Sequence, residues 1–218
     1  MKLYVPTIVR ELKNHYKEYL HDIKSYPNIH THLEALAICM YDGIKNNHAC
    51  IKKEISNYHK DYLGKEELIK PHLFKLEDCK QAIANEYGFP NWLALEKLSK
   101  DQYNYNFEKA VNLLISGNIN DLKKLITEES ELLSSRSQYG HQATLLHYAA
   151  SNGVEFWRQQ VPLNLPEIVE YLLKAGVDKT ATMKVYGGEY DTYALLTTSI
   201  HPLKAGVMNS MVEILKPE

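Results

Sequence analysis

An internal repeat in the second half of the chain constrains the fold more than any other feature. Three segments share one order: a short apolar helix pattern, a turn, and a second helix pattern that ends in neighbouring aliphatic residues. They are VNLLISGNINDLKKLI at 111–126, LHYAASNG at 146–153 with EIVEYLL at 167–173, and ALLTTSIH at 194–201 with SMVEIL at 210–215. A single helix pair cannot bury its own apolar face, so such pairs must stack. The repeat therefore predicts a short helical solenoid.

The first hundred residues lack this repeat but also read as helices. Apolar residues recur every three to four positions from Val9 to Ile23, and further helices are predicted at 31–45, 47–63, 76–87 and 91–98. Short loops join them, which is typical of a bundle. We expect an all-α protein, with a helical N-terminal bundle over 1–104 that ends in the helix pair 76–98, followed by the repeats over 105–218.

The loop before the third repeat is long enough for an additional element. Its middle reads MKVYGGEYDTY, in which apolar and polar residues alternate around Gly187-Gly188. Alternation on both sides of a Gly-Gly pair is typical of a β-hairpin with a two-residue turn. A hairpin is therefore predicted between the second and third repeats.

The repeat motifs resemble those of ankyrin-repeat proteins. TLLHYAASNG is similar to the T-P-L-H-x-A-A-x-x-G pattern, with Leu145 in place of Pro, and EIVEYLLKAGVD at 167–178 is similar to I-V-x-x-L-L-x-x-G-A-D. The resemblance implies about three ankyrin repeats with hairpin loops. It gives structural roles in capping, close packing and turning to Thr144, His147, Ala149, Ala150, Gly153, Leu172, Leu173 and Gly176.

A narrower resemblance, to a group of bacterial ankyrin-repeat proteins, covers roughly residues 107–216. It rests on TLLHYAASNGVEFWRQ, PEIVEYLLKAGVD and VYGGEYDTYALLTTSIHPLKAGV, and it departs from the group at Glu189 and Thr197. Upstream, CKQAIANEYGFPNWLALEKL at 79–98 resembles a helix pair that often precedes such repeats. The resemblance implies a fold and a habit of binding partners, but no reaction.

Two repeats depart from the ankyrin pattern by insertion at the same point. Ile168 follows Gly153 by fifteen residues, where the pattern needs about four, and the third repeat has a further insertion that holds Pro202 and Gly206. In a stack, such insertions lie side by side on one edge. The first insertion begins Val-Glu-Phe-Trp-Arg-Gln-Gln, which raises the question of whether this segment packs or binds.

The insertions and the hairpin supply the candidate contact residues. Arg offers a planar fork for carboxylate or phosphate, and Trp or Tyr offers a stacking face. The candidates for binding a partner or a ligand are Trp157, Arg158, Gln159, Tyr186, Tyr190 and His201. If they bind, Arg158→Ala and Tyr186→Ala should weaken binding and leave thermal stability nearly unchanged. The alternative is that Trp157 and Arg158 only pack the enlarged turn.

The function we expect is non-enzymatic protein–protein interaction. An alternative is a small-ligand or hydrolytic pocket between the second and third repeats, using His147, Arg158, Thr198 and His201; a third places the function in the N-terminal bundle. The sequence has no G-x-S-x-G nucleophile motif, no phosphate-binding loop and no metal-ligand spacing. We therefore assign no catalytic residue, metal or cofactor.

Charge and composition do not indicate a particular class of partner. The chain has 25 Lys and Arg against 27 Asp and Glu, so it lacks the basic field that draws a protein to nucleic acid or anionic lipid. It shows no signal peptide, no run of membrane-spanning length and no disulfide pattern among its 3 Cys. We expect a cytoplasmic protein with an unidentified protein partner, and leave its oligomeric state open.

Overall fold

The computed structural model describes residues 2–21, 23–98 and 103–217. This part of the chain is mostly helical with a few short strands, which agrees with the predicted all-α class. It divides into two compact units. Unit 1 combines Met1–Val9 with Asn104–Glu218, and unit 2 is Arg10–Tyr103.

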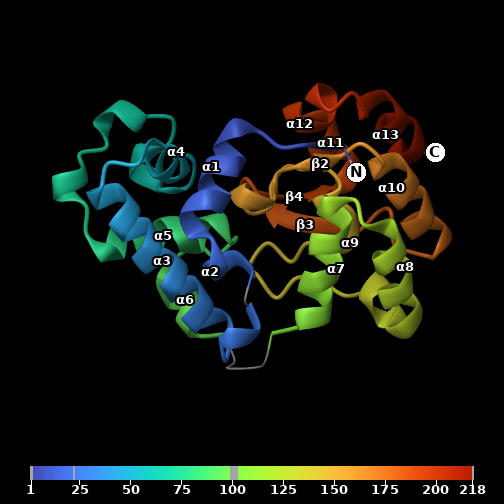
Figure 1. The fold of residues 1–218 in the computed structure, drawn as a ribbon, viewed down its shortest axis with the longest axis horizontal. Coiled ribbons are helices and arrows are strands. Elements are labelled where there is room, and N and C mark those ends of the chain that lie inside the picture. The colour runs from blue at the N-terminus through green and yellow to red at the C-terminus, as the bar shows by residue number, and fades with distance from the viewer. Residues whose placement is uncertain (1, 22, 99–102, 218) are drawn as a thin grey trace. The chain divides into compact units, whose positions relative to one another are not determined.

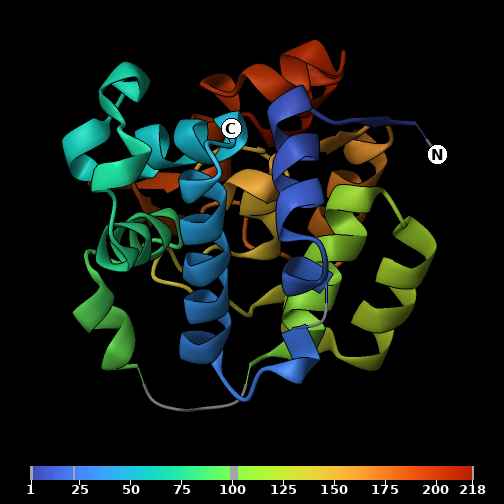
Figure 2. The same cartoon turned by 60° about the vertical axis from the view of Figure 1, so that its left-hand side comes forward.

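Unit 2 consists of helices around one apolar core. Its longest helix, α3, lies beside α5, as Figure 2 shows, and also packs against α4. The elements in chain order are α1 (Thr7–Tyr16, which begins in unit 1), α2 (Glu18–His21), η1 (Ile23–Ser25), α3 (Ile29–Lys45), α4 (Ala49–Tyr58), η2 (Lys60–Tyr62), η3 (Glu66–Leu68), η4 (Pro71–Leu73), α5 (Leu76–Glu86) and α6 (Trp92–Glu96).

Two of the predicted helices in this region are shorter than expected. The helix predicted to run through Ile23 breaks at Lys17, whose φ is 44°. The one predicted over 47–63 ends at Tyr58, because His59 is extended and its ring accepts a hydrogen bond from the Asp61 N–H at 3.3 Å. Apolar spacing continues past both breaks, which is why the sequence pattern alone missed them.

Unit 1 contains the helices α7 to α13, all labelled in Figure 1. Buried aliphatic residues of α7 to α11 and of α13 form one continuous core. The helical elements are α7 (Tyr105–Ser116), α8 (Ile119–Glu128), η5 (Ser130–Leu133), α9 (Leu145–Tyr148), η6 (Phe156–Arg158), α10 (Leu165–Lys174), α11 (Thr192–Thr197), α12 (Ile200–Lys204) and α13 (Met208–Leu215). The insertion predicted in the third repeat is therefore partly helical, as α12.

The predicted hairpin is present, but its turn lies one residue earlier than expected. β3 (Thr182–Val185) pairs antiparallel with β4 (Gly188–Asp191), and the turn residues are Tyr186 and Gly187, with φ of 53° and 77°. Two positive φ values define a type I′ turn. Gly188 is the first residue of β4, where a Cβ would come within 3.0 Å of the Tyr190 ring. The second glycine thus makes room for the aromatic ring two residues later on the same strand.

A second small sheet joins the start of the chain to the enlarged turn. β1 (Leu3–Tyr4) pairs antiparallel with β2 (Val161–Pro162), and the Leu163 N–H donates to the Lys2 carbonyl at 3.2 Å. The sequence did not predict this pairing, because two-residue strands leave no periodic pattern. It places the first nine residues in unit 1, whereas the predicted boundary assigned them to the bundle.

Candidate functional site

The enlarged turn is an interior structure of unit 1. Every residue from Val154 to Gln160 is buried, including the polar and charged ones. The short helix η6 turns its Phe, Trp and Arg side chains into the protein. These residues therefore do not form a surface loop.

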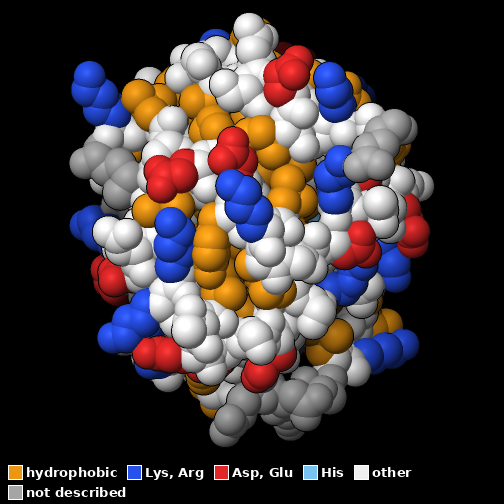
Figure 3. Space-filling view, turned by 90° about the vertical axis from the view of Figure 1, so that its right-hand side faces the viewer, with side chains coloured by type: hydrophobic (Ala, Val, Ile, Leu, Met, Phe, Trp, Pro, Cys, Tyr) orange, Lys and Arg blue, Asp and Glu red, His pale blue; other side chains and the backbone are white. Residues whose placement is uncertain are grey.

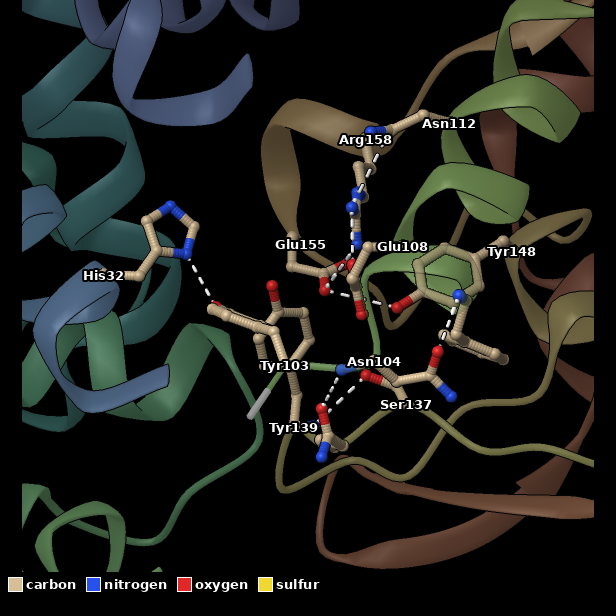
Figure 4. Close-up of polar contacts among 12 residues, drawn as sticks. His32, Tyr103, Asn104, Glu108, Asn112, Ser137, Tyr139, Tyr148, Glu155 and Arg158 are labelled. Atoms are coloured by element: carbon tan, nitrogen blue, oxygen red, sulfur yellow. Dashed lines mark hydrogen bonds and ion pairs between the residues drawn. The ribbon is translucent and has the colours of Figure 1, made fainter. Parts of the chain in front are cut away.

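Arg158 lies at the centre of a buried ionic network (Figure 4). Its guanidinium Nη2 is 2.7 Å from Glu108 Oε2 and its Nη1 is 3.3 Å from Glu155 Oε1. Nη2 also donates to Asn112 Oδ1 at 3.3 Å. Glu108 and Asn112 come from α7, so the network ties the enlarged turn to the first helix pair.

The same carboxylate of Glu155 accepts from a second set of side chains. Its Oε1 is 3.3 Å from the Tyr148 hydroxyl and 3.4 Å from His141 Nε2. The Arg158 guanidinium carbon lies 5.5 Å from the centroid of the Tyr148 ring and 4.6 Å from that of Trp157. Cation–π contacts of this kind favour the charged guanidinium inside the protein.

The ionisation of the network follows from burial and from the single cation that two carboxylates share. Burial raises the pKa of Glu108, and the attraction of Arg158 offsets this only in part. Burial would also raise the pKa of Glu155, but Arg158 and then His141 outweigh it, so that pKa lies below its usual value. Burial would lower the pKa of Arg158, but the two carboxylates raise it well above the usual value. Arg158 therefore stays charged and pairs with both carboxylates.

The remaining polar side chains of the enlarged turn bond to backbone carbonyls. Gln159 Nε2 donates to the Val154 carbonyl at 2.9 Å and Gln160 Nε2 to the Ile115 carbonyl at 3.1 Å. Asn164 Nδ2 donates to the Gly117 carbonyl at 3.0 Å. Carbonyls at a helix C-terminus lack hydrogen-bond donors within the helix. The amides of Gln160 and Asn164 donate to two such carbonyls at the end of α7. Buried polar residues thus fix the path of the insertion.

The residues of the TLLHYAASNG motif have structural positions. The Thr144 N–H donates to His147 Nδ1 at 3.0 Å, and the Thr144 hydroxyl is 2.8 Å from the same nitrogen. Ala149 and Ala150 are fully buried. Burial lowers the pKa of His147 to about 4, so its ring is neutral at pH 7. Gly153 has a φ of 74°, and a Cβ there would come within 3.2 Å of Val185.

The motif at the end of α10 is also structural. Leu172 is fully buried and Leu173 is half-buried against the same core. Gly176 has a φ of 100°, and a Cβ there would meet no atom within 4 Å, so the backbone conformation is what requires glycine.

Tyr186 and Tyr190 lie at the surface, where they line a hollow of about 570 Å³. The Tyr186 hydroxyl donates to Asn152 Oδ1 at 2.6 Å, and Asn152 Nδ2 donates to Thr198 Oγ1 at 3.0 Å. Asn152 thus connects the hairpin to the end of α11. The hollow is lined by Asn152, Tyr186, Tyr190, Ala194, Leu195, Thr197 and Thr198.

A second hollow of about 420 Å³ adjoins the first. Its lining includes Ile200 and Leu203, which are 49% and 56% exposed, and it shares Thr197 and Thr198 with the first hollow. We call the two hollows together the surface groove. All the described residues that line it are uncharged.

A different face of unit 1, which carries α8, α10 and α13, is shown in Figure 3. Hydrophobic side chains form a band there, and basic and acidic side chains lie across it. Lys123 Nζ is 5.3 Å from the centroid of the Tyr171 ring and 4.0 Å from Glu167 Oε1. The Lys123 side chain therefore covers part of the apolar surface of α10.

The structure separates the predicted contact residues into three places. Trp157, Arg158 and Gln159 are inside unit 1, and Tyr186 and Tyr190 are on its surface groove. His201 is half-buried beside Tyr4, with 6.2 Å between their ring centroids, and burial followed by the nearby Lys204 lowers its pKa. The six residues do not form one cluster.

The sequence pattern did not indicate Glu108 and Asn112 as partners of Arg158, His141 as a partner of Glu155, or Asn152 as a residue of the groove. One indication was available, since Glu108 is in line with Val111 and Ile115 on the apolar face of α7. A carboxyl group on such a face needs a buried polar or charged partner, or must be protonated.

Comparisons with known proteins give this chain no relative. No family model, curated protein or solved structure matches it. Within the described residues, no three His, Cys, Asp or Glu side chains are grouped to hold a metal ion, and no helix has the length and apolar character needed to cross a bilayer. The function must therefore be argued from the site itself.

Proposed function

We propose that unit 1 is an ankyrin-type stack of three helix pairs that binds a protein partner through its surface groove. The order of helices α7 to α13, the Thr144–His147 cap and the hairpin between α10 and α11 support the ankyrin part of this proposal. The groove supports the binding part.

The observation that carries the proposal is the exposure of large apolar side chains along the groove. Ile200 and Leu203 project from α12, and Tyr186 projects from the hairpin turn at 68% exposure. Exposed apolar groups gathered around a hollow are typical of interaction surfaces, and aromatic residues are common at their centres. An apolar segment of the partner would bind in the two adjoining hollows of the groove.

Partner binding is tested with a double substitution in the groove and, as a control, a double substitution of similarly exposed apolar side chains elsewhere. The full chain carrying Ile200→Ser and Leu203→Ser should capture its partner from an extract of the source cells about tenfold less well than wild type. The control carries Leu63→Ser and Leu68→Ser, two residues of unit 2 that are 53% and 52% exposed.

The captured protein is identified, purified and titrated against each variant by calorimetry. Wild-type affinity in the groove variant, or equal loss in both variants, would contradict the proposal. A folded-state check by circular dichroism accompanies each titration.

The alternative of a small-ligand or hydrolytic pocket receives less support. The first hollow has a volume within the range of ligand sites, roughly 300–1,000 Å³. However, Arg158 and His147, which this alternative requires, are both buried and already bonded within the fold. Retained partner capture by the groove variant, together with binding of a small molecule to the first hollow, would favour the alternative.

A further inference from the structure

The hairpin has one covered edge and one open edge. The outer edge of β3 is hydrogen-bonded to the loop between η5 and α9. The Lys184 N–H donates to the His141 carbonyl at 2.9 Å, and Arg136 Nη1 donates to the Thr182 carbonyl at 2.7 Å. In the described part of the chain this sheet has two strands, so no strand pairs with the outer edge of β4. An open strand edge is a template for another strand.

The register shows which backbone groups β4 offers. A two-residue turn closes with Val185 and Gly188 as a hydrogen-bonded pair, so the next pair, Lys184 and Glu189, points its N–H and C=O groups outward. The bond from Lys184 to His141 confirms this direction on the β3 side. By the same alternation, the Glu189 N–H and C=O face the open edge, and in the described residues neither group has a hydrogen-bond partner.

The two faces of β4 differ in charge. Gly188 and Tyr190 lie on one face of β4. On that face, Tyr190 lines the uncharged first hollow. Glu189 points its carboxylate to the other face, where it is exposed and accepts from the Thr182 hydroxyl at 3.3 Å. Among the described residues no cation lies within ion-pair distance of it, although Lys184 is directly across the ladder.

An added strand would therefore meet different chemistry on its two faces. Its residues on the Tyr190 face would enter an uncharged hollow, where a charged side chain would lose its hydration without gaining a partner. The residue between them would lie beside the Glu189 carboxylate, where a cation is favoured. Charge complementarity thus selects a basic residue flanked by two uncharged ones.

We propose that the partner binds by adding an extended segment to the open edge of β4, with a Lys or Arg beside Glu189 and an uncharged residue on each side of it. This inference rests on the proposed partner-binding function and specifies the form and chemistry of the segment. Main-chain hydrogen bonds to Glu189 supply affinity, and the alternation of side chains supplies selectivity.

The test uses three labelled nine-residue peptides and fluorescence anisotropy with the full chain. The first has Ser and Thr flanks around a central Val-Lys-Val. The second replaces the central Lys by Glu and should bind about fivefold more weakly, because like charges then face each other. The third carries an N-methyl group on the central Lys and should bind about tenfold more weakly, because it cannot donate to the Glu189 carbonyl.

Three protein variants complete the test. Glu189→Lys should reverse the order of the first two peptides. Glu189→Pro should abolish binding of the first peptide, and since its N–H faces outward, the substitution leaves the β3–β4 ladder intact. Glu167→Lys, a charge reversal at an exposed position of α10, is the matched control and should bind like wild type.

Failure of the first peptide to bind at about 1 mM, the weak end of measurable affinities, would overturn the inference. Equal binding of all three peptides, or an unchanged order with Glu189→Lys, would overturn it as well. If the peptides fail while the Ile200 and Leu203 substitutions still abolish partner capture, strand addition is wrong and the proposed function stands. If the peptides behave as expected while those substitutions leave capture unchanged, the groove is wrong and the strand edge stands.

Discussion

Arg158 is an interior charge whose value to the protein depends on its partners. Removing a charge from water is costly, and the cost is recovered only where geometry and hydrogen bonds are good. Here two carboxylates, an amide and two aromatic rings surround the guanidinium. The role we assign to Arg158 is therefore to hold the enlarged turn against α7.

We predict that Arg158→Ala destabilises unit 1 by about 3–5 kcal/mol, because it leaves Glu155 and Glu108 buried without their cation. This reverses the expectation from sequence that the substitution would spare thermal stability. Urea unfolding in a Trp92→Phe background, followed by Trp157 fluorescence, measures the change. Arg158→Lys serves as control, since it keeps the charge and loses the fork; an unchanged midpoint for Arg158→Ala would show that the network is dispensable.

One residue of the hairpin turn, Tyr186, has both a strained backbone and an exposed side chain. Tyr186 has a φ of 53°, which costs a non-glycine residue about 1 kcal/mol, and Asn accepts this conformation more readily. Its ring is nevertheless exposed beside the groove. Strain retained at an exposed aromatic residue is typical of a contact residue.

We predict that Tyr186→Asn stabilises the hairpin by up to about 1 kcal/mol and weakens partner capture, because Asn-Gly is the preferred type I′ sequence but supplies no ring. Thermal melting and calorimetric titration with the captured partner measure the two effects. Gly187→Ala is the contrasting variant: with a φ of 77° and an open side, it should lose stability and keep the ring. A Tyr186→Asn variant that binds normally would remove this residue from the binding surface.

At the scale of the whole molecule, the two units hold buried titratable groups that respond to pH in opposite directions. In unit 2, Tyr16 donates to Glu54 at 2.6 Å, and burial, followed by the nearby Glu86, raises the pKa of Glu54 well above its usual value. In unit 1, burial lowers the pKa of His147 from 6.5 to about 4.

The sign of each effect follows from proton linkage. The folded state binds the Glu54 proton more tightly than the unfolded state, so this stabilisation is complete below pH 4.5 and is lost as pH rises toward the folded pKa. The folded state binds the His147 proton less tightly, so its contribution is complete above pH 6.5 and is lost as pH falls toward about 4.

We predict that Glu54→Gln stabilises unit 2 more at pH 8 than at pH 4. Between pH 7 and pH 5, the loss of stability of unit 1 should be about 2 kcal/mol smaller in the His147→Gln variant than in its parent. Comparing each variant with its parent cancels the opposite contribution of Glu108. The chain has 2 Trp, one in each unit, so Trp92→Phe leaves a reporter for unit 1 and Trp157→Phe leaves one for unit 2. Parallel pH profiles for variant and parent would contradict the assignment.

The sequence by itself determined the mostly helical character of the chain and the place of the hairpin. Both are local properties: apolar residues at helical spacing face a common core, and Gly187 permits a tight turn wherever strands flank it. The pattern did not show that the turn lies one residue earlier, with Gly188 in β4 beside the Tyr190 ring.

Only the tertiary structure decided whether the Val-Glu-Phe-Trp-Arg-Gln-Gln segment faces solvent or protein. Arg158 is 0% exposed because Glu108, fifty residues earlier in the chain, provides a carboxylate on the buried face of α7. The pairing of β1 with β2 was decided in the same way, by contacts between residues about 160 positions apart. Sequence periodicity records which residues prefer burial, but which buried charges meet depends on how distant segments pack, and that information is in the fold.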